Sequence, residues 1–459
     1  MKRIILKRGE ELRHFAGHPW VFDNEILSVM PDKSNVPNNG GIGQLEKGEI
    51  ADVETAHKEY VGRAFVNPHS KIVARLYSSS KEGVDEGFFK RRIRQAIGTR
   101  KNYNLEKESC RLVFAEADFL PGLIIDQYVG WDAEKIFANG NLSFPLDFNT
   151  LCETFGTPQK WISVQFLSYG MDIRKSEILS AVEQVLQNPE KLEENSESPA
   201  VSGKIEGIIE RSAAPVREKE DLPLYEAVLK GTFPSGGIII FENDFPFLVD
   251  LVQGQKTGHF LDQKENHKRA ADAAKQLQTS LGRTIKVLDG FCYSGAFALN
   301  IARSCDAEII AADSSEAALG VLKKNCELNG VSTITVAAEN VFDLLTKYER
   351  AKETFDLIVL DPPAFAKSRT AMDGAVRGYK EINLKAIKLL SPNGILITCS
   401  CSYAMTDEKF KAIIAEAATD ARKRLYQLDF CYQSTDHPIL VGYDESQYLK
   451  CGFYRVFKK

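Results

Sequence analysis

The chain has 459 residues, of which 44% are hydrophobic and 26% charged, and this composition predicts a globular protein of about two to four domains. Its formal net charge of −5 excludes a surface that is basic all over, but it is compatible with local basic patches. No apolar run approaches the roughly 18 to 20 residues that span a bilayer, and the N-terminus lacks a signal-peptide pattern. Nine scattered cysteines suit a reducing compartment, so we expect a cytoplasmic protein.

Short β segments, such as RIILKR and YVGRAFVNP, alternate with turn residues over residues 1–77. This pattern predicts a small β-rich domain at the N-terminal end of the chain.

A basic helix is predicted next, at 88–101, where FFKRRIRQAIGTRK carries six basic residues and no acidic one. Its apolar residues recur at helical spacing, so the basic side chains share the opposite face. That face is either a solvated surface or a contact surface for the phosphates of a nucleic acid. Strand-like segments at 110–128 and 161–170 and a helix at 176–187 complete a mixed α+β domain, which we place at 78–235.

Strands and helices alternate in the last part of the chain. Five apolar segments each precede a helical pattern, at 285–289, 308–313, 333–338, 356–361 and 394–400. Continuous apolar strands are typical of a parallel sheet that is covered by helices on both faces. We therefore predict a doubly wound α/β sheet within 236–459, with its ligands at the carboxyl ends of the strands.

The first strand of this sheet leads into VLDGFCYSGAFALNIA, which lacks both common phosphate-binding patterns. G-x-G-x-x-G is absent, and Ala-Phe stands where a P-loop has Lys and Ser/Thr. What remains is an acid, Asp289, and a turn that contains Gly290, Ser294 and Gly295. Asp313 ends the next strand, where a carboxylate can accept hydrogen bonds from both ribose hydroxyls of an adenosine. Alternatively, the two acids only cap the helices that follow them.

An acidic pocket without lysine fits a ligand that has adenosine and a positive charge but no phosphate, and S-adenosylmethionine is such a ligand. Asn340, after the third strand, could accept a hydrogen bond from the adenine amino group. The fourth strand ends in DPPAF, where two prolines stop strand pairing and fix the loop. Unless this loop is a plain terminator, it holds Asp361 and Phe365 rigidly toward the cofactor and the substrate.

Cys399 and Cys401 lie at the end of the fifth strand, on the same edge of the sheet. A zinc site needs three or four ligands, and no second Cys/His cluster lies nearby in the sequence, so we expect no metal. A disulfide between residues i and i+2 is strained. A thiolate just beyond the strand could instead add to C6 of a pyrimidine, which makes C5 nucleophilic enough to accept a methyl group from a sulfonium. This favours Cys401 as the nucleophile, with buried packing as the alternative for either thiol.

Several longer motifs follow one another along nearly the whole chain: HPWVF (18–22), ADFLPGLIIDQY (117–128), GQKTGHFLDQKENHKR (254–269), FCYSGAF (291–297), DPPAFAKS (361–368), RGYKEINLKAI (377–387), CSCS (399–402) and DHPI…DESQYLK (436–450). Together they resemble the bacterial ribosomal RNA large-subunit methyltransferase I family, which are cytosine-C5 methyltransferases. The resemblance implies a PUA-like RNA-binding domain for 1–77 and a Rossmann-like class I methyltransferase domain for 236–459. It also implies S-adenosylmethionine as the cofactor.

The resemblance further implies roles for single residues. Cys401 is the nucleophile of a Ser-Cys-Ser pattern, Asp361 binds the N3/N4 edge of the cytosine, and Phe365 stacks on the extruded base. Three residues of GHFLDQ would contact the methionine part of the cofactor: Phe260, Asp262 and Gln263.

Our leading hypothesis is a cytosine-C5 methyltransferase that acts on 23S ribosomal RNA through a covalent Cys–C6 adduct. Methylation of a ring nitrogen or exocyclic amine of RNA, which needs no thiol, is the second hypothesis, and a non-catalytic RNA-binding ribosome-assembly factor is the third. We also expect that the chain could form a homodimer. Residues of HPWVF and of the basic helix are expected to contact RNA: His18, Trp20, Lys90, Arg91, Arg92 and Arg94.

Overall fold

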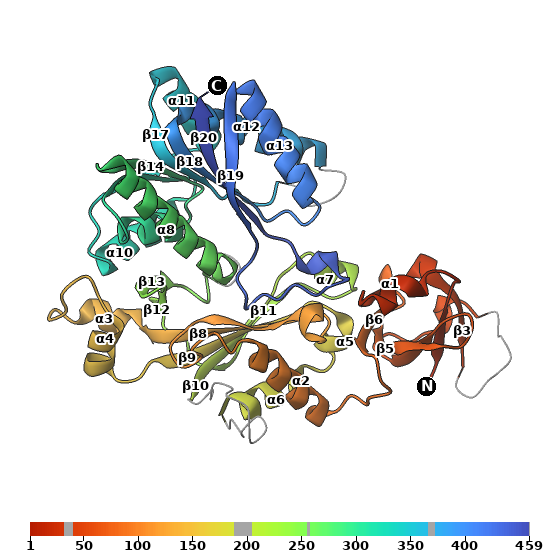
Figure 1. Ribbon diagram of the computed structural model, residues 1–459. Coiled ribbons are helices and arrows are strands. Elements are labelled where there is room, and N and C mark those ends of the chain that lie inside the picture. The colour runs from red at the N-terminus through yellow and green to blue at the C-terminus, as the bar shows by residue number, and fades with distance from the viewer. Residues whose placement is uncertain (32–39, 188–203, 255–257, 366–371, 459) are drawn as a thin grey trace.

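The computed structural model describes residues 1–31, 40–187, 204–254, 258–365 and 372–458, and it contains three sheets along the chain (Figure 1). The first sheet has six strands in the order β2-β6-β5-β4-β1-β3 and encloses an apolar core. This is the β-rich domain that the sequence predicts for residues 1–77. Its elements are β1 (Arg3–Leu6), α1 (Glu11–Phe15), β2 (Trp20–Phe22), β3 (Ile26–Met30), β4 (Ile50–Glu54), β5 (Tyr60–Val66) and β6 (Ile72–Ser78).

The second sheet has seven strands, in the order β11-β10-β9-β8-β12-β13 with β7 added beside β8. Its strands are β7 (Cys110–Phe114), β8 (Leu123–Asp132), β9 (Gln159–Phe166), β10 (Ile205–Ser212), β11 (Tyr225–Gly231), β12 (Ile238–Glu242) and β13 (Phe245–Val249). The helices of this region are α2 (Glu86–Thr99), α3 (Ala133–Ala138), α4 (Phe148–Phe155), α5 (Tyr169–Asp172), α6 (Lys175–Gln187) and α7 (Val216–Lys219).

The two faces of this central sheet differ, because successive side chains of a strand point to opposite sides. Ile125 of β8 and Val164 of β9 are paired neighbours and lie in a core with residues of α2 and α6. Ile124 and Gln165, the adjacent pair, face the other way and line a cavity. In Figure 1, α2 and α6 lie on one side of the sheet and the third sheet lies on the other.

The predicted boundary between residues 235 and 236 is wrong, because β12 and β13 belong to the central sheet. Ile239 of β12 pairs with Trp131 of β8, and β12 also pairs with β13 as a hairpin. The turn between them is Asn243-Asp244, whose φ angles of 52° and 66° are those of a tight hairpin turn. The two short apolar strands on either side of this turn resemble the buried strands of the third sheet. The sequence pattern alone therefore could not assign them to the central sheet.

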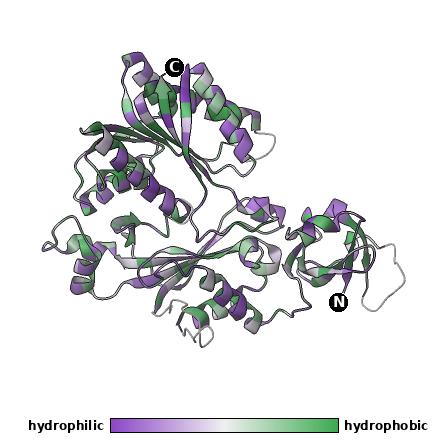
Figure 2. Ribbon diagram, viewed as in Figure 1, coloured by the Kyte–Doolittle hydropathy of each residue, from purple (hydrophilic) through white to green (hydrophobic). Residues whose placement is uncertain are grey.

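The third sheet has the order β16-β15-β14-β17-β18-β20-β19 and is the predicted doubly wound sheet. Its first five strands are parallel, and β20 and β19 pair antiparallel at one edge. Figure 2 shows its central strands largely in green, as expected for strands that helices cover on both faces. The strands are β14 (Ile285–Gly290), β15 (Ala307–Asp313), β16 (Ile334–Ala338), β17 (Phe355–Leu360), β18 (Leu390–Ser400), β19 (Lys423–Cys431) and β20 (Lys450–Lys458).

The strand order reverses at β14, which has β15 on one side and β17 on the other. Such a reversal opens a crevice at the carboxyl ends of the strands, where ligands bind in this type of sheet. The helices around the sheet are α8 (Lys264–Leu281), α9 (Ala296–Ala302), α10 (Glu316–Leu328), α11 (Val341–Ala351), α12 (Met372–Leu389) and α13 (Asp407–Asp420).

Candidate active site

A cavity of about 630 Å³, which we call the first cavity, lies at the carboxyl ends of β14, β15, β17 and β18. None of the described residues that line it is a lysine or an arginine, whereas three aspartates line it. This charge pattern does not suit a phosphate-bearing nucleotide. Nine residues that the sequence singled out lie in its wall: Phe260, Asp262, Gln263, Ser294, Asp313, Asn340, Asp361, Phe365 and Cys401.

Asp313 is fixed at the rim by two backbone donors. Its carboxylate accepts hydrogen bonds from the N–H of Tyr293 at 3.0 Å and from the N–H of Ser315 at 2.8 Å. Each carboxylate oxygen can accept a further hydrogen bond, so the side chain is oriented and still able to bind hydroxyl groups.

Asn340 caps α11 and lies in the wall of the first cavity. Its side-chain oxygen accepts a hydrogen bond from the N–H of Phe342 at 2.9 Å. The oxygen can still accept a second hydrogen bond and the amide nitrogen can donate, so both groups of the side chain remain available to a ligand.

Asp289, Gly290 and Gly295 do not line the first cavity, so the structure does not support their predicted contact with a cofactor. The Asp289 carboxylate accepts the N–H of Ala298 at 3.1 Å and so caps α9, as in the alternative interpretation. Burial raises the pKa of Asp289 to about 8. Gly295 has φ +84°, and a Cβ there would lie 2.1 Å from Leu322, so helix packing requires this glycine.

The two predicted catalytic side chains lie on neighbouring loops. The Cys401 thiol donates to the carbonyl of Pro362 at 4.0 Å, and Pro362 directly follows Asp361. Gln263 donates from Nε2 to the Asp361 carboxylate at 3.1 Å. Gln263 therefore orients Asp361 in addition to lining the cavity.

Cys399 differs from Cys401 although both come from the same strand end. Cys399 is fully buried, and its Sγ lies 3.2 Å from Sγ of Cys451 on the paired strand β20. Burial raises the pKa of the Cys399 thiol well above its usual range. Both sulfurs are free thiols, and Cys399 is a packing residue.

Tyr379 of α12 holds the loop around Cys401, a role that the sequence did not reveal. Its phenol oxygen accepts a hydrogen bond from Ser400 at 2.9 Å and lies 3.2 Å from the hydroxyl of Ser402. Burial raises the pKa of Tyr379 to about 12. The sequence pointed to Tyr379 only through its position in RGYKEIN, a motif to which we assigned no role.

A buried triad of Glu242, His259 and His267 joins the central sheet to the first cavity, and we did not predict it, although both histidines lie in the motif at 254–269. The Glu242 carboxylate lies 2.7 Å from Nε2 of His259 and 2.6 Å from Nδ1 of His267. Burial alone would raise the pKa of Glu242, but the two imidazoles outweigh burial and lower it. Burial would lower the pKa of His267, but Glu242 outweighs burial and raises it. Glu242 lies on β12, and both histidines line the cavity.

The basic helix α2 is not the free basic face that the sequence predicted. Lys90 pairs with Glu86 at 2.7 Å, and Arg91 and Arg92 both pair with Glu82 at 3.0 Å. These acids lie just before the segment 88–101, which is why that segment alone looked free of acids. The helix also lies on the face of the central sheet that is turned away from the third sheet (Figure 1).

His18 and Trp20 lie in contacts within the chain rather than on an open RNA-binding face. Trp20 donates from Nε1 to Glu116 at 2.7 Å, and its ring packs edge-on against Tyr443 at 5.0 Å between centroids. His18 lies 3.4 Å from the Glu445 carboxylate. HPWVF therefore joins the N-terminal domain to the loop between β19 and β20.

Two further features concern the described part of the chain. No helix in it is long and apolar enough to cross a membrane. No group of three or more His, Cys, Asp or Glu side chains in it is arranged to hold a metal ion.

Comparison with known proteins relates both ends of the chain to described domains. Residues 4–79 match the family described as a PUA-like domain, and residues 281–444 match the family described as a methyltransferase domain. The chain is 35% identical over 462 residues to a protein of Shewanella denitrificans named ribosomal RNA large subunit methyltransferase I, covering 99% of each chain. A protein of the same name from Erwinia tasmaniensis is 33% identical, over 98% of each chain.

Solved structures show the same fold over the full length. A protein from Streptococcus mutans described as a SAM-dependent methyltransferase superposes with a TM-score of 0.73 at 19% identity, over 99% of this chain and 100% of that one. A second structure with the same TM-score, identity and coverage is described as a methyltransferase complexed with SAH.

Proposed function

Because the chain belongs to the ribosomal RNA large subunit methyltransferase I family, we propose that it methylates C5 of one cytosine in 23S ribosomal RNA. S-adenosylmethionine is the methyl donor that the methyltransferase domain implies. The cytoplasm is the compartment that this substrate implies. A homodimer stays a prediction, because neither the names of the relatives nor the described residues bear on it.

The residues of the first cavity fit this cofactor. The cavity is acidic and its described lining has no lysine or arginine, as suits a cationic adenosine derivative without phosphates. Asp313 would accept from the ribose hydroxyls, Asn340 would accept from the adenine amino group, and Phe260 would lie against the methionine part. When bound, S-adenosylmethionine supplies an electrophilic methyl group on a sulfonium.

The chain's own chemistry begins at Cys401. Its thiolate adds to C6 of the cytosine, and the electrons of the C5–C6 double bond shift so that C5 becomes nucleophilic. Asp361, held by Gln263, binds the N3/N4 edge and stabilises the ring while it is saturated. After C5 has gained a methyl group, its proton passes to a base, the electrons of the C5–H bond restore the C5–C6 double bond, and Cys401 leaves C6 as a thiolate.

One observation supports this chemistry above the others: the Cys401 thiol contacts Pro362, the residue next to Asp361, in the wall of the first cavity. A nucleophile and a group that binds the base edge are thereby within reach of one pyrimidine ring. Methylation of an exocyclic amine would need only the DPPAF loop and would leave the thiol unexplained.

Bisulfite sequencing of ribosomal RNA from cells with and without the gene tests the proposal. We expect one cytosine of 23S RNA to lose its protection from deamination when the gene is removed, and mass analysis of its nucleoside to give 5-methylcytidine. Methylcytidine with the methyl group on a ring nitrogen or exocyclic amine would contradict the proposal. If RNA modification is unchanged and calorimetry detects no binding of S-adenosylmethionine, the scaffold hypothesis holds instead.

A further inference from the structure

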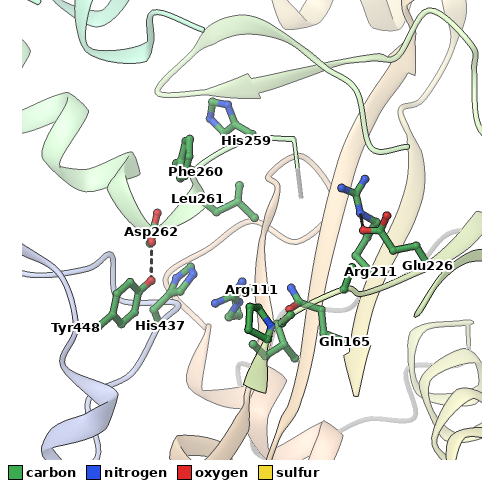
Figure 3. Close-up of a pocket in the computed structure, with 14 residues that line it drawn as sticks. Arg111, Gln165, Arg211, Glu226, His259, Phe260, Leu261, Asp262, His437 and Tyr448 are labelled. Carbon is green, nitrogen blue, oxygen red and sulfur yellow. Dashed lines mark hydrogen bonds and ion pairs between the residues drawn. The ribbon is translucent and has the colours of Figure 1, made fainter. Parts of the chain in front are cut away.

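A second cavity, of about 470 Å³, lies between the central sheet and the loop that leads into α8 (Figure 3). His259, Phe260 and Asp262 line both this cavity and the first one, so a single segment separates the two. In Figure 3 that segment lies on one side, and Arg111 and Gln165 lie across from it. A volume of this size accommodates a nucleoside.

The floor of the second cavity is one face of the central sheet, opposite to the face that α2 and α6 cover. Ile124 of β8 pairs with Gln165 of β9, and both line the cavity. Arg211 of β10 and Glu226 of β11 are also a pair on this face. The side chains therefore form a row across four neighbouring strands, a flat and largely polar platform.

Three polar groups at the second cavity have no hydrogen-bond partner among the described residues. Arg111 uses Nε and Nη2 on Asp126, at 2.7 and 2.9 Å, which leaves Nη1. His437 is 2% exposed and holds Asp436 through Nδ1 at 2.8 Å, which leaves Nε2. The side-chain amide of Gln165 offers both a donor and an acceptor to the cavity. His437 is buried, Arg111 and Gln165 are half-buried, and all three line the cavity, so these groups are open to hydrogen bonds with a polar ligand.

Phe260 and Tyr448 contribute aromatic rings to the wall of the second cavity, and the contacts of Tyr448 hold its ring in place. Tyr448 donates to the Asp262 carboxylate at 2.5 Å. Phe114 packs against both Tyr448 and His437, at 6.0 and 5.5 Å between centroids. Rings fixed in this way can stack on a flat ligand without losing much conformational entropy.

The charges favour a base over a phosphate. Arg111 is paired with Asp126, and Arg211 is paired with Glu226 at 2.9 Å and donates to the carbonyls of Leu251 and Val252. With its arginines neutralised, the cavity offers hydrogen-bond groups of both kinds but no surplus positive charge. An RNA base presents such mixed donors and acceptors on an aromatic ring.

We propose that the second cavity binds the extruded base of an unpaired nucleotide that adjoins the target cytosine. This inference rests on the proposed function, since it assumes that RNA places its reacting base in the first cavity. Gln165, Arg111 and His437 read the edge of the neighbouring base, and Tyr448 and Phe260 contact its face. Selection of the RNA strand would then depend on two adjacent bases rather than one.

Binding of short RNA tests the inference without requiring turnover. The probe is a nine-nucleotide RNA with one central cytidine between adenosines, measured by fluorescence anisotropy with saturating S-adenosylhomocysteine. Ala213 is an exposed residue at the cavity, so Ala213→Trp fills the space from the rim without changing the core. Ala412→Trp, at an exposed position of α13, is the matched control.

We expect Ala213→Trp and Gln165→Met each to raise the RNA dissociation constant, the former by about tenfold. An abasic nucleotide on one side of the cytidine should weaken binding to the parent about tenfold and leave the Ala213→Trp value unchanged, because the two changes remove the same contact. The control variant should behave like the parent. The dissociation constant of S-adenosylhomocysteine should be the same in all four proteins.

The inference is overturned if the abasic probes weaken binding to the parent and to Ala213→Trp equally, or if the parent does not bind the probe. Loss of S-adenosylhomocysteine binding in Ala213→Trp would also overturn it, because the cavity would then belong to the cofactor. If the methylated product is not 5-methylcytidine, the proposed function fails while this affinity test still gives an answer.

Discussion

Cys399 and Cys401 come from one strand end and have different surroundings. Alternation along a strand places i and i+2 on the same side, so the sequence could not separate the two thiols by pattern alone. The two thiols differ because β18 ends at Ser400. Cys399 remains paired with Cys451 in the sheet, whereas Cys401 lies in the loop at the first cavity. The chemical argument that the nucleophile lies in the loop beyond the strand also predicted Cys401.

Tyr379 provides a test of how that loop is held. Tyr379→Phe removes the oxygen that accepts from Ser400 and keeps the ring in its apolar surroundings. We expect kcat to fall about tenfold, because the loop around Cys401 loses an anchor, while the affinity for S-adenosylmethionine stays constant. Steady-state kinetics and calorimetry measure the two quantities. Unchanged kcat would show that Tyr379 contributes only packing.

At the scale of elements, what could be predicted depends on whether the signal is local in the sequence. The parallel sheet was predictable, because continuous apolar strands and helical spacing are strong local signals. The hairpin β12–β13 was not, because its assignment depends on pairing with β8, more than one hundred residues earlier in the chain. Asp289 likewise lies at the end of a recognisable strand, yet whether it faces a ligand or caps α9 depends on tertiary packing.

The Glu242 triad links β12 to α8, and its pH dependence follows from the shifted pKa values. Glu242 has a folded pKa below its usual 4.5, so its contribution is complete above about pH 4.5 and is lost on acidification. His267 has a folded pKa above its usual 6.5, so its contribution is complete below about pH 6.5 and is lost as the pH rises through the raised value.

We therefore expect Glu242→Gln to lower the melting temperature most between about pH 4.5 and 6.5, by roughly 5 °C, and less at alkaline pH. Glutamine keeps one acceptor oxygen, so one of the two buried histidines loses its acceptor, and the negative charge that stabilises the imidazolium is removed. Calorimetric scans of parent and variant between pH 4 and 9 measure the difference. A difference that stays constant over this range would show that the triad is not ionised in the folded protein.

The ion pairs of α2 change what we expect from its basic residues. With Lys90, Arg91, Arg92 and Arg94 all replaced by Gln, the plot of log Kd against log salt concentration should change its slope by less than one for ribosomal RNA. Four lost phosphate contacts would change the slope by about three to four. Such a large change would restore the RNA-binding role that the sequence suggested for this helix.

At the scale of the whole molecule, the loop between β19 and β20 connects all three sheets. Its Tyr443 packs on Trp20 of the N-terminal domain, its Asp436 accepts from the backbone N–H of Arg111 in the central domain, and its His437 lines the second cavity. Sequence motifs marked both HPWVF and the DHPI segment of this loop. That the two segments lie on the same interface could be learned only from the fold.

Trp20→Ala should loosen the N-terminal domain without altering the cofactor site. It removes the ring that packs on Tyr443 and leaves Glu116 without its indole donor. We expect kcat/KM for ribosomal RNA to fall about tenfold and limited proteolysis near residue 78 to become faster, with unchanged S-adenosylmethionine affinity. Trp20→Phe, which keeps a ring, is the control. Equal proteolysis rates for Trp20→Ala and the parent would contradict this account of the interface.

The central claim is that Cys401 bonds to C6 of a cytosine, and 23S RNA transcribed with 5-fluorocytidine tests it most directly. Fluorine at C5 replaces the proton whose loss releases the enzyme, so the adduct should persist after methyl transfer. With S-adenosylmethionine present, we predict that the parent and Cys399→Ala carry a covalently bound nucleotide after nuclease digestion and denaturation, and that Cys401→Ser carries none. An adduct on Cys401→Ser, or none on a parent that methylates ordinary 23S RNA, would contradict the claim.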